Sequence, residues 1–339
     1  MNPAFQGLLT IAIGVGGCLS YFYFSNQFLD KVLFPAKGPN AGRNINRANL
    51  IRPWLFLLPA ILALGLYLAY PVFETIRLSL TERETLPDGT TIYNFVGLAN
   101  YSQMASEPKF WEAMRNNMLW LIVVPALSTA FGLLAAQLTD RIAWGNIAKS
   151  LIFMPMAISF VGAAVIWKLV YDARPPDTEQ IGVLNAVYVW MTGNDPQQWL
   201  TIPFWNSFLL MIVLIWIQTG FAMVILSAAL RGIPEETIEA AIVDGANPFQ
   251  IFFKIKMPQI AGTIVVVWTT ITLVVLKVFD IVFAMTNGQW ETQVLANYMF
   301  DKLFRANDWG VGSASAIVIM LLVTPILIWN VRNARNEMR

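Results

Sequence analysis

Histidine is absent from this chain of 339 residues, and cysteine occurs once, as Cys18. Without histidine the chain lacks the usual ligands for haem and zinc, the base of serine and cysteine nucleophiles, and the most convenient proton relay near neutral pH. One cysteine excludes a disulfide or a cysteine metal cluster within the chain, so we expect Cys18 to be a packing residue. These absences count against most enzyme mechanisms, and a membrane enzyme would lack a nucleophile, a base and a metal site. We therefore predict no metal site, no catalytic residue and no enzymatic activity.

Charge is also scarce: 13% of the residues are charged and 57% are hydrophobic, whereas soluble domains are about a quarter charged. The 22 basic and 21 acidic residues nearly balance, so the basic surface typical of nucleic-acid binding is missing. So much apolar surface exceeds what a soluble core can bury. The composition indicates a membrane protein.

Seven stretches approach the roughly 20 apolar residues that a helix needs to cross the bilayer. They are Phe5–Phe24, Pro53–Pro71, Asn117–Leu138, Ser150–Tyr171, Phe204–Ser227, Ile260–Ala284 and Ser313–Trp329. No Lys or Arg precedes Lys31, so the first stretch lacks the basic start of a signal peptide and is expected to be a retained helix. Ile181–Met191 is about half a span long, which favours an interfacial or re-entrant helix. We predict an all-α, polytopic membrane protein.

The basic residues predict the orientation, because cytoplasmic loops carry an excess of Lys and Arg. One set of alternate loops and ends holds thirteen basic residues and the other holds seven. The N-terminus is therefore expected outside and the C-terminus in the cytoplasm. This orientation leaves Val72–Asn116 and Asp172–Pro203 outside and Leu230–Gln259 in the cytoplasm.

The cytoplasmic loop has the pattern of two short helices. Pro234 suits the first position of one helix, and Gly245 suits a left-handed stop after it. Asn247 is a good N-cap for the next helix, and Pro258 disfavours helical geometry at Met257 and should end that helix.

Phe249, Phe252 and Phe253 have the spacing of residues on one helix face. An aromatic face on such a helix fits a hydrophobic groove on a partner. An amphipathic loop packed on the protein's own helix ends would have the same pattern, and the spacing leaves both readings open.

Polar residues within the spans are candidates for a solute pathway. Lys277 and Asp280 are three residues apart in the sixth span and are expected on one side of a helix, on the pathway or in a structural ion pair. In the fifth span Gln218 lies one turn from Phe221, and an amide beside an aromatic ring suits a sugar.

Glu239-Ala240-Ala241, then Gly245, then Ile255-Lys256-Met257-Pro258 resembles the EAA signature of permease subunits of binding-protein-dependent ABC importers, with Met257 in place of the usual Leu. Further landmarks resemble carbohydrate permeases in order: Tyr70-Pro71, Ser79-Leu80, Phe95–Tyr101, Phe153-Met154-Pro155, Trp167, Gly182–Asn185 and Val278-Phe279-Asp280. The N-terminal helix and its linker are most similar to those of α-glucoside permease subunits, relatives of the larger maltose permease subunit. Thr286-Asn287-Gly288-Gln289-Trp290 departs from the family's Thr-x-Gly-Gly-Pro.

The resemblance implies a type I ABC importer fold in which the loop 231–259 is a pair of coupling helices bound by an ATPase. The implied ATPase contacts are Glu239, Ala240, Ala241, Asp244, Gly245, Phe249, Phe252, Phe253, Ile255 and Pro258. The implied solute-pathway candidates are Gln218, Phe221, Lys277, Phe279 and Asp280. The sixth-span positions matching maltose contacts are Ile271, Val274 and Val275, all apolar, so a polar maltose-like pocket does not transfer as a whole.

The resemblance also implies the domain organisation. Residues 1–52 are expected to form an extra transmembrane helix and a basic linker, 53–116 a second helix and a periplasmic segment, 117–330 the core permease domain, and 331–339 a cytoplasmic tail.

The implied function is transport of a sugar, an α-glucoside or other oligosaccharide, across the bacterial inner membrane. The implied partners are a second homologous permease subunit, a cytoplasmic ATPase dimer and a periplasmic sugar-binding protein, with ATP and Mg²⁺ held by the ATPase and no cofactor in this chain. No Gly-x-x-x-x-Gly-Lys-Ser/Thr phosphate loop occurs. The alternative is a stand-alone proton-coupled transporter using Lys277 and Asp280, which would need internal repeats and broken helices that the sequence does not reveal.

Overall fold

The computed structural model describes residues 3–140 and 142–337 of the chain. Arg141 and Arg339, two of the basic residues counted for the orientation, lie outside the described residues. The fold is mainly helical, with one β-hairpin, and divides into two compact units, Met1–Glu74 and Thr75–Arg339.

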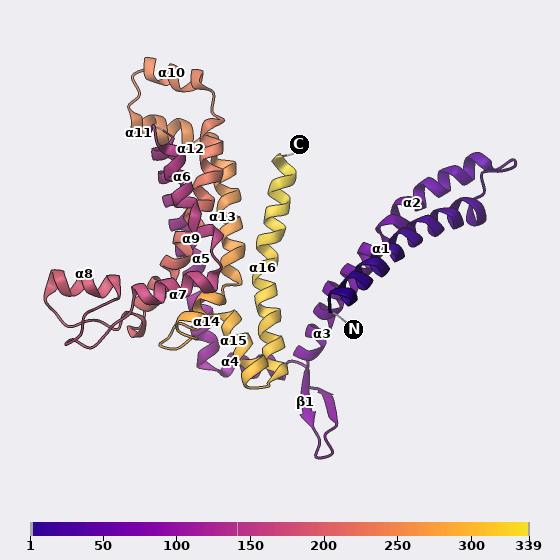
Figure 1. Ribbon diagram of the computed structural model, residues 1–339, viewed down its shortest axis with the longest axis horizontal. Helices are drawn as coiled ribbons and strands as arrows, with labels where there is room; N and C mark the ends of the chain where they lie inside the picture. The colour runs from indigo at the N-terminus through magenta and orange to yellow at the C-terminus, as the bar shows by residue number, and fades with distance from the viewer. Residues whose placement is uncertain (1–2, 141, 338–339) are drawn as a thin grey trace. The chain divides into compact units, whose positions relative to one another are not determined.

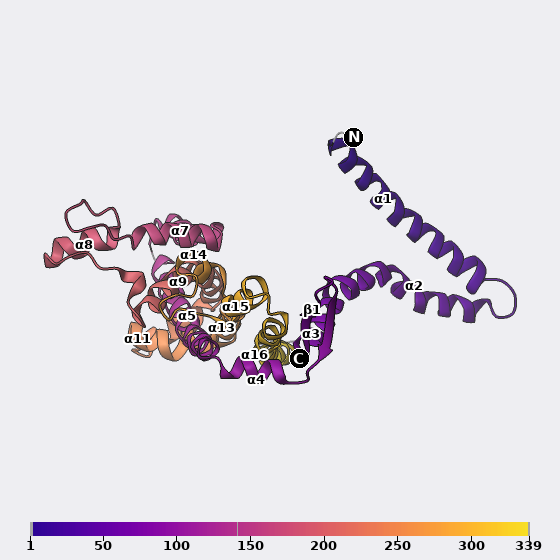
Figure 2. The same cartoon turned by 90° about the horizontal axis from the view of Figure 1, so that it is seen from below.

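The first unit contains two long apolar helices joined by a turn (Figures 1 and 2). The helix α1 (Pro3–Phe28) runs into a widened π-helical turn, Leu29–Leu33. The helix α2 (Ala41–Leu64) continues through a second such turn, Gly65–Ala69, into α3 (Tyr70–Ser79), which leads into the second unit. The Tyr21 hydroxyl donates to the Leu55 carbonyl at 2.8 Å and ties α1 to α2. Exposed apolar side chains cover both helices, as expected for helices surrounded by lipid.

A small antiparallel hairpin opens the second unit. It consists of β1 (Thr81–Thr85) and β2 (Thr91–Phe95), with Thr81 paired to Phe95. The turn chemistry at Leu86–Gly89 is visible in the sequence, but the two strands were not predicted. Both strands have only five residues, and β1 is entirely polar, so the periodic pattern of a strand is too short to stand out in the sequence.

Three long helices form the centre of the second unit: α5 (Pro108–Thr139), α9 (Trp205–Arg231) and α13 (Ala261–Leu276), which pack against one another (Figures 1 and 2). Large fully buried side chains of this core come mainly from α9 and its neighbours, and include Trp120, Leu210, Leu214, Met223 and Ile271. The helices α4 (Ala99–Ser106) and α16 (Trp309–Glu337) pack together and carry a smaller core with α5 and α15 (Leu295–Phe300).

Two of the predicted spans are broken. The fourth consists of α6 (Gly145–Phe153), a 3₁₀ turn (Met154–Ala157) and α7 (Phe160–Val170), with a bend of 104° between its halves. The expectation of one continuous helix was wrong there, because Pro155 removes a backbone donor and Ser159 caps a new helix by accepting from the Gly162 N–H at 3.1 Å.

The sixth predicted span is also discontinuous. The segment before it is α11 (Pro248–Gln250), a π-helical turn (Ile251–Lys256) and α12 (Met257–Gln259), and it meets α13 at a bend of 71°. The helix α13 ends at Leu276, and α14 (Asp280–Met285) begins after a three-residue break.

The described residues contain five helices long and apolar enough to cross a membrane, or up to seven if each bent pair counts as one span. Five of the seven predicted spans lie in the long helices, and the fourth and sixth overlap the two bent pairs. The short apolar segment forms α8 (Val183–Thr192), followed by a 3₁₀ turn (Trp199–Thr201), and the remaining short helices are α10 (Glu235–Val243) and the π-helical turn Asp301–Arg305 after α15.

Candidate functional site

The end of α10 is fixed by a hydrogen-bonded turn. Gly245 has a φ of +80°, its N–H donates to the Ile242 carbonyl at 3.0 Å, and the Ala246 N–H donates to the Ala241 carbonyl at 2.9 Å. These two bonds form a Schellman motif, which needs a left-handed residue at this position. Pro234 caps α10 and does not occupy its first helical position, one residue away from the prediction.

The outward surface of α10 is acidic. Glu235, Glu236, Glu239 and Asp244 are exposed, and none of them forms a hydrogen bond through its side chain or an ion pair with another described residue. Ala240 is exposed beside them, whereas Ala241, also predicted as an ATPase contact, is buried at 7% exposure. The loop therefore offers four carboxylates to whatever contacts it.

A capping box starts the second helix of the loop. Asn247 accepts from the Gln250 N–H at 2.8 Å, and Gln250 Oε1 accepts from the Asn247 N–H at 2.9 Å. The predicted stop before Pro258 was wrong, because Met257 is helical and its N–H donates to the Phe252 carbonyl five residues earlier. The widened π-helical turn carries the helix through the position that the pre-proline rule disfavours.

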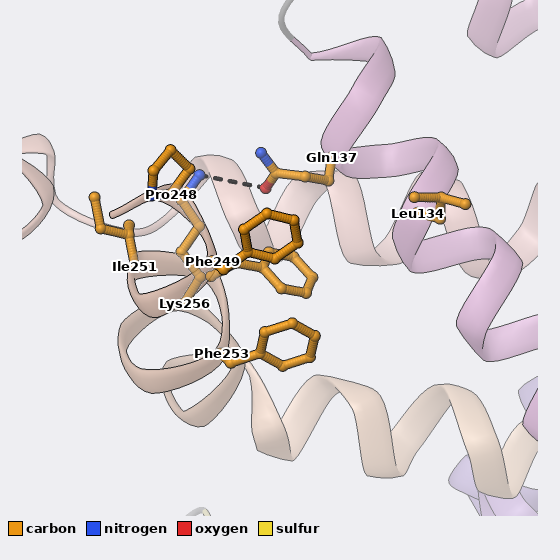
Figure 3. Close-up of a pocket in the computed structure, with 8 residues that line it drawn as sticks. Leu134, Gln137, Pro248, Phe249, Ile251, Phe253 and Lys256 are labelled. Carbon is orange, nitrogen blue, oxygen red and sulfur yellow. Dashed lines mark hydrogen bonds between the residues drawn. The ribbon is translucent and has the colours of Figure 1, made fainter. Parts of the chain in front are cut away.

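Three phenylalanine rings of this helix line a groove with Leu134 of α5 (Figure 3). Phe249 and Phe253 are 77% and 60% exposed, whereas Phe252 packs against the main core. The sequence left two interpretations open, an aromatic face for a partner and a loop packed on the protein's own helices, and the loop combines both. One ring anchors it to its own helices, and two rings remain accessible to a partner.

The groove also contains a polar contact between the loop and α5. Lys256 Nζ donates to Gln137 Oε1 at 3.3 Å (Figure 3). Of the other predicted contact residues in this stretch, Ile255 is half-buried and Pro258 is exposed. This bond connects the loop to the end of α5.

One turn beyond Gln137, a charged cluster joins the ends of α5, α6 and α9. Asp140 forms an ion pair with Lys149, and both side chains are mostly buried, at 19% and 15% exposure. Ser227 Oγ donates to the Asp140 carboxylate at 3.0 Å, and Arg231 Nε lies 3.7 Å from it. This cluster was not predicted because its members are far apart in the chain, although each stands at the end of a predicted span.

Glycines allow the same three helices to approach at backbone distance. A Cβ at Gly220 of α9 would lie 2.6 Å from the Ile152 carbonyl oxygen of α6, and a Cβ at Gly132 of α5 would collide with Ala222 of α9. Such close packing leaves the helices little freedom to slide. The helices α5, α6 and α9 therefore form one tightly joined group.

A second group of candidate functional residues lies near two helix breaks, the one between α6 and α7 and the one between α13 and α14. Gln218 of α9, Asp280 at the start of α14 and Ser159 line one cavity, whose apolar wall includes Met156 and Phe160. Gln218 is only 6% exposed, yet its amide has no hydrogen-bond partner among the described side chains and backbone groups. Because Gln218 lines the cavity, a ligand or water there can supply hydrogen bonds to its amide.

Lys277 and Asp280 were predicted to lie on one side of a single helix, and this prediction was wrong. The helix ends at Leu276 and restarts at Asp280, so the two residues flank a break. They form no ion pair with each other or with other residues in the described ranges. Phe279 and Lys277 line a cavity with Asp280, and the break contains neither Gly nor Pro that would have revealed it.

The remaining predicted pathway residues differ in access. Phe221 is half-buried against the core. Ile271 and Val275 are fully buried, and only Val274 reaches a cavity wall. The structure thus brings Gln218, Lys277, Phe279 and Asp280 to neighbouring cavities and leaves Phe221 outside them.

A buried polar network between the start of α5 and the segment after α14 was also not predicted. Asn116 Nδ2 donates to the carbonyls of Glu291 and Gln293, both at 2.8 Å, and the Leu295 N–H donates to Asn117 Oδ1 at 2.8 Å. These bonds fasten the segment after α14 to α5. The two adjacent asparagines at the start of the third predicted span were the available signal.

The sequence matches the family "Binding-protein-dependent transport system inner membrane component" over residues 128–336. It is 63% identical, over 99% of both chains, to the alpha-glucoside transport system permease protein AglF of Rhizobium meliloti. It is 47% identical to the osmoprotective compounds uptake permease protein GgtC of Synechocystis, over 84% of this chain and 99% of that one. These matches confirm the resemblance to sugar permeases that the motifs indicated.

The fold resembles that of a chain in the crystal structure of a bacterial ABC transporter involved in the import of the acidic polysaccharide alginate. The TM-score is 0.71 at 21% identity, and the match covers 86% of this chain and 98% of the other. A chain of the same kind of transporter, in complex with an alginate pentasaccharide-bound periplasmic protein, matches with the same score at 20% identity. The predicted ABC importer fold is therefore confirmed.

Proposed function

Because this chain belongs to the family of binding-protein-dependent transport system inner membrane components, we propose that the solute it carries as a permease subunit is an α-glucoside. It is a multi-pass protein of the inner membrane. The identity of 63% over the full length of an α-glucoside permease supports this choice of solute. We further propose that a periplasmic binding protein delivers the sugar and that a second, homologous permease subunit completes the channel.

The observation that carries the proposal is the loop from α10 to α12. Hydrogen bonds within the loop fix the turn at Gly245 and the cap at Asn247, while four acids and two phenylalanines face outward. The chain has no phosphate loop, so energy from ATP has to enter through contact with another protein. We propose that this loop is the contact with an ATPase dimer, which holds the ATP and Mg²⁺.

The proposed mechanical route leads from the loop to the helix breaks. Closure of the ATPase would displace α10, and the Lys256–Gln137 contact would pass the displacement to α5. The group α5–α6–α9 would respond as a unit, since Asp140 and the close glycine contacts join its members. The helix α6 ends at the 104° bend beside Gln218, so the motion would reach the cavity where we propose that the sugar binds.

At that cavity Gln218 can donate to and accept from sugar hydroxyls, and the Asp280 carboxylate can accept from two of them. Phe160 and Phe279 offer rings for the apolar face of a sugar. The apolar side chains at Ile271, Val274 and Val275 suggest fewer polar contacts than in a maltose-like pocket.

Transport by the complete complex in proteoliposomes tests this function. With the ATPase and the binding protein present, we expect uptake of radiolabelled α-glucosides such as trehalose or maltose that requires internal ATP. Uptake by this chain alone, driven by a pH gradient without ATP, would contradict the proposal and favour the proton-coupled alternative.

A charge reversal tests the loop separately. Glu239→Lys should weaken docking of the ATPase, seen as reduced co-purification, because it reverses one of the four outward charges. Glu84→Lys, an exposed acid of the hairpin, is the matched control and should leave co-purification unchanged. If the Glu239→Lys complex stays intact and still couples ATP hydrolysis to uptake, Glu239 is not a contact residue.

A further inference from the structure

The turn between α1 and α2 carries a concentration of positive charge. The segment Leu29–Arg52, which we call the basic tip, contains five basic residues and a single acid, Asp30. The preceding helix α1 contains no charged residue at all. The basic tip is thus the charged end of an otherwise apolar helical pair.

The basic tip has a defined structure of its own. Leu29 and Ala48 are 1% and 3% exposed, so the two sides of the turn pack together. Asn44 Nδ2 donates to the Pro35 carbonyl at 3.0 Å and closes the turn. The charged side chains are therefore displayed on a fixed scaffold.

Only one of the five cations is neutralised within the first unit. Arg52 forms an ion pair with Asp30 at 2.6 Å. The other four basic residues are exposed and form no hydrogen bond or ion pair with any residue that the structure describes: Lys31, Lys37, Arg43 and Arg47. The tip is left with four open positive charges and no acid to balance them.

The position of these charges along the helices matches the lipid headgroups. The apolar part of α2 begins at Pro53, and Trp54, 65% exposed, is the kind of residue that lies at the membrane interface. Arg47 lies five residues before Arg52, about 7 Å along the helix, and Lys31 follows Asp30 directly. The headgroup layer is roughly 5–8 Å thick on each side of the bilayer, so Lys31 falls within it and Arg47 lies at its outer edge. Arg43, nine residues before Arg52, lies roughly 13 Å along the helix, on the aqueous side of the layer.

We propose that the basic tip binds the phosphates of anionic phospholipids through Lys31, Lys37, Arg43 and Arg47. Clusters of basic residues next to a membrane span attract anionic lipid, and their ammonium and guanidinium groups form charge-assisted hydrogen bonds with phosphate. The tip would hold the first helical pair at a set depth and gather acidic lipid around it. This role is independent of the solute and of the ATPase.

Spin-labelled lipids test the proposal on the full chain reconstituted in bilayers of phosphatidylcholine with about a third phosphatidylglycerol. We expect the wild type to retain labelled phosphatidylglycerol in preference to labelled phosphatidylcholine at low salt. The variant K31Q/K37Q/R43Q/R47Q should lose this preference by about fivefold or more, the effect of at least one basic residue near an anionic surface. The charge-preserving variant K31R/K37R/R43K/R47K should keep it.

Salt and pairwise variants make the result specific. The preference should fall sharply at about 1 M salt, where the screening length is about 3 Å. If the fourfold variant does not insert, K31Q/K37Q and R43Q/R47Q are compared, and each should lose part of the preference. An unchanged lipid preference in the neutralised variants overturns the proposal. If these variants keep the lipid preference but no longer co-purify with the ATPase, the basic tip binds a protein partner instead.

Discussion

Polar side chains of the second unit have different surroundings in two regions, the end of the helices nearest α10 and the level of the helix breaks. At the end of α5 and α9 nearest α10, Asp140 has Lys149, Ser227 and Arg231 as partners. At the helix breaks, Gln218 and Asp280 line a cavity and have no partner among the described residues. Paired groups hold helices in one arrangement, whereas open groups are available to a solute. This difference fits the proposed roles, in which the paired end transmits motion from the ATPase and the level of the helix breaks binds the sugar.

The largest expected effect comes from separating the closely packed helices. Gly220→Val would force α9 away from the Ile152 carbonyl of α6, at a cost of about 3 kcal/mol. We expect a lower thermal unfolding temperature of the purified complex and loss of uptake. Gly65→Val is the control, since a Cβ there meets no atom within 4 Å. Equal behaviour of the two variants would mean that the α6–α9 contact does not matter for transmission.

The next effect tests the charged cluster. Asp140→Asn removes the carboxylate that Lys149 needs in a mostly buried position, which should cost about 2 kcal/mol of stability. Asp30→Asn breaks the more exposed ion pair of the first unit and should cost less than about 1 kcal/mol. Chemical denaturation of both variants measures the difference. A similar loss in the two would remove the distinction between a structural cluster and an ordinary surface pair.

A smaller and more selective effect is expected at the binding level. Gln218→Ala should raise the KM for sugar uptake about tenfold, as for the loss of one or two hydrogen bonds, and leave the basal ATPase rate of the complex unchanged. Thr219→Ala, next to it in α9, is the control because its hydroxyl bonds to its own helix at the Ile215 carbonyl. A change in basal ATPase rate without a change in KM would move Gln218 from the binding level to the transmitting group.

The smallest expected effect is on the stability of the turn between β1 and β2, which belongs to neither of the two regions compared above. Hydrogen bonds from the Thr90 hydroxyl and backbone N–H lower the pKa of Asp88 below its ordinary value of 3.8. The turn is therefore stabilised above that value, and the stabilisation is lost as the pH falls through the lower, folded pKa. Hydrogen exchange at the Thr90 amide, measured against Asp88→Ala, should show extra protection at pH 6 that disappears on strong acidification. Uptake should not follow this change.

The sequence predicted the spans better than their breaks. Apolar length identifies each membrane crossing because the bilayer imposes it. The break at Pro155 had a local signal, whereas the break after Leu276 contains no Gly or Pro that would mark it in the sequence. The stop expected at Met257 failed because a π-helical turn changed the hydrogen-bond register before Pro258.

In the candidate site too, the features that depend on neighbouring residues were predicted, and those that depend on distant residues were not. The caps at Gly245 and Asn247 follow from local sequence and were predicted, since a left-handed turn and a capping side chain are properties of a few consecutive residues. The Asp140 cluster and the pairing of Gln218 with Asp280 at one cavity depend on residues far apart in the chain. The ATPase contacts and the sugar contacts stay predictions.

Disulfide cross-linking tests the central claim, that the outward face of α10 is where this permease meets its ATPase. In a Cys18→Ala background, Glu239→Cys in the assembled complex should cross-link to a cysteine introduced in the ATPase, and the yield should change with ATP. Thr91→Cys on the hairpin should give no such product. A Glu239→Cys complex that hydrolyses ATP and transports sugar, yet never cross-links to any of a set of cysteines covering the membrane-facing surface of the ATPase, would contradict the account.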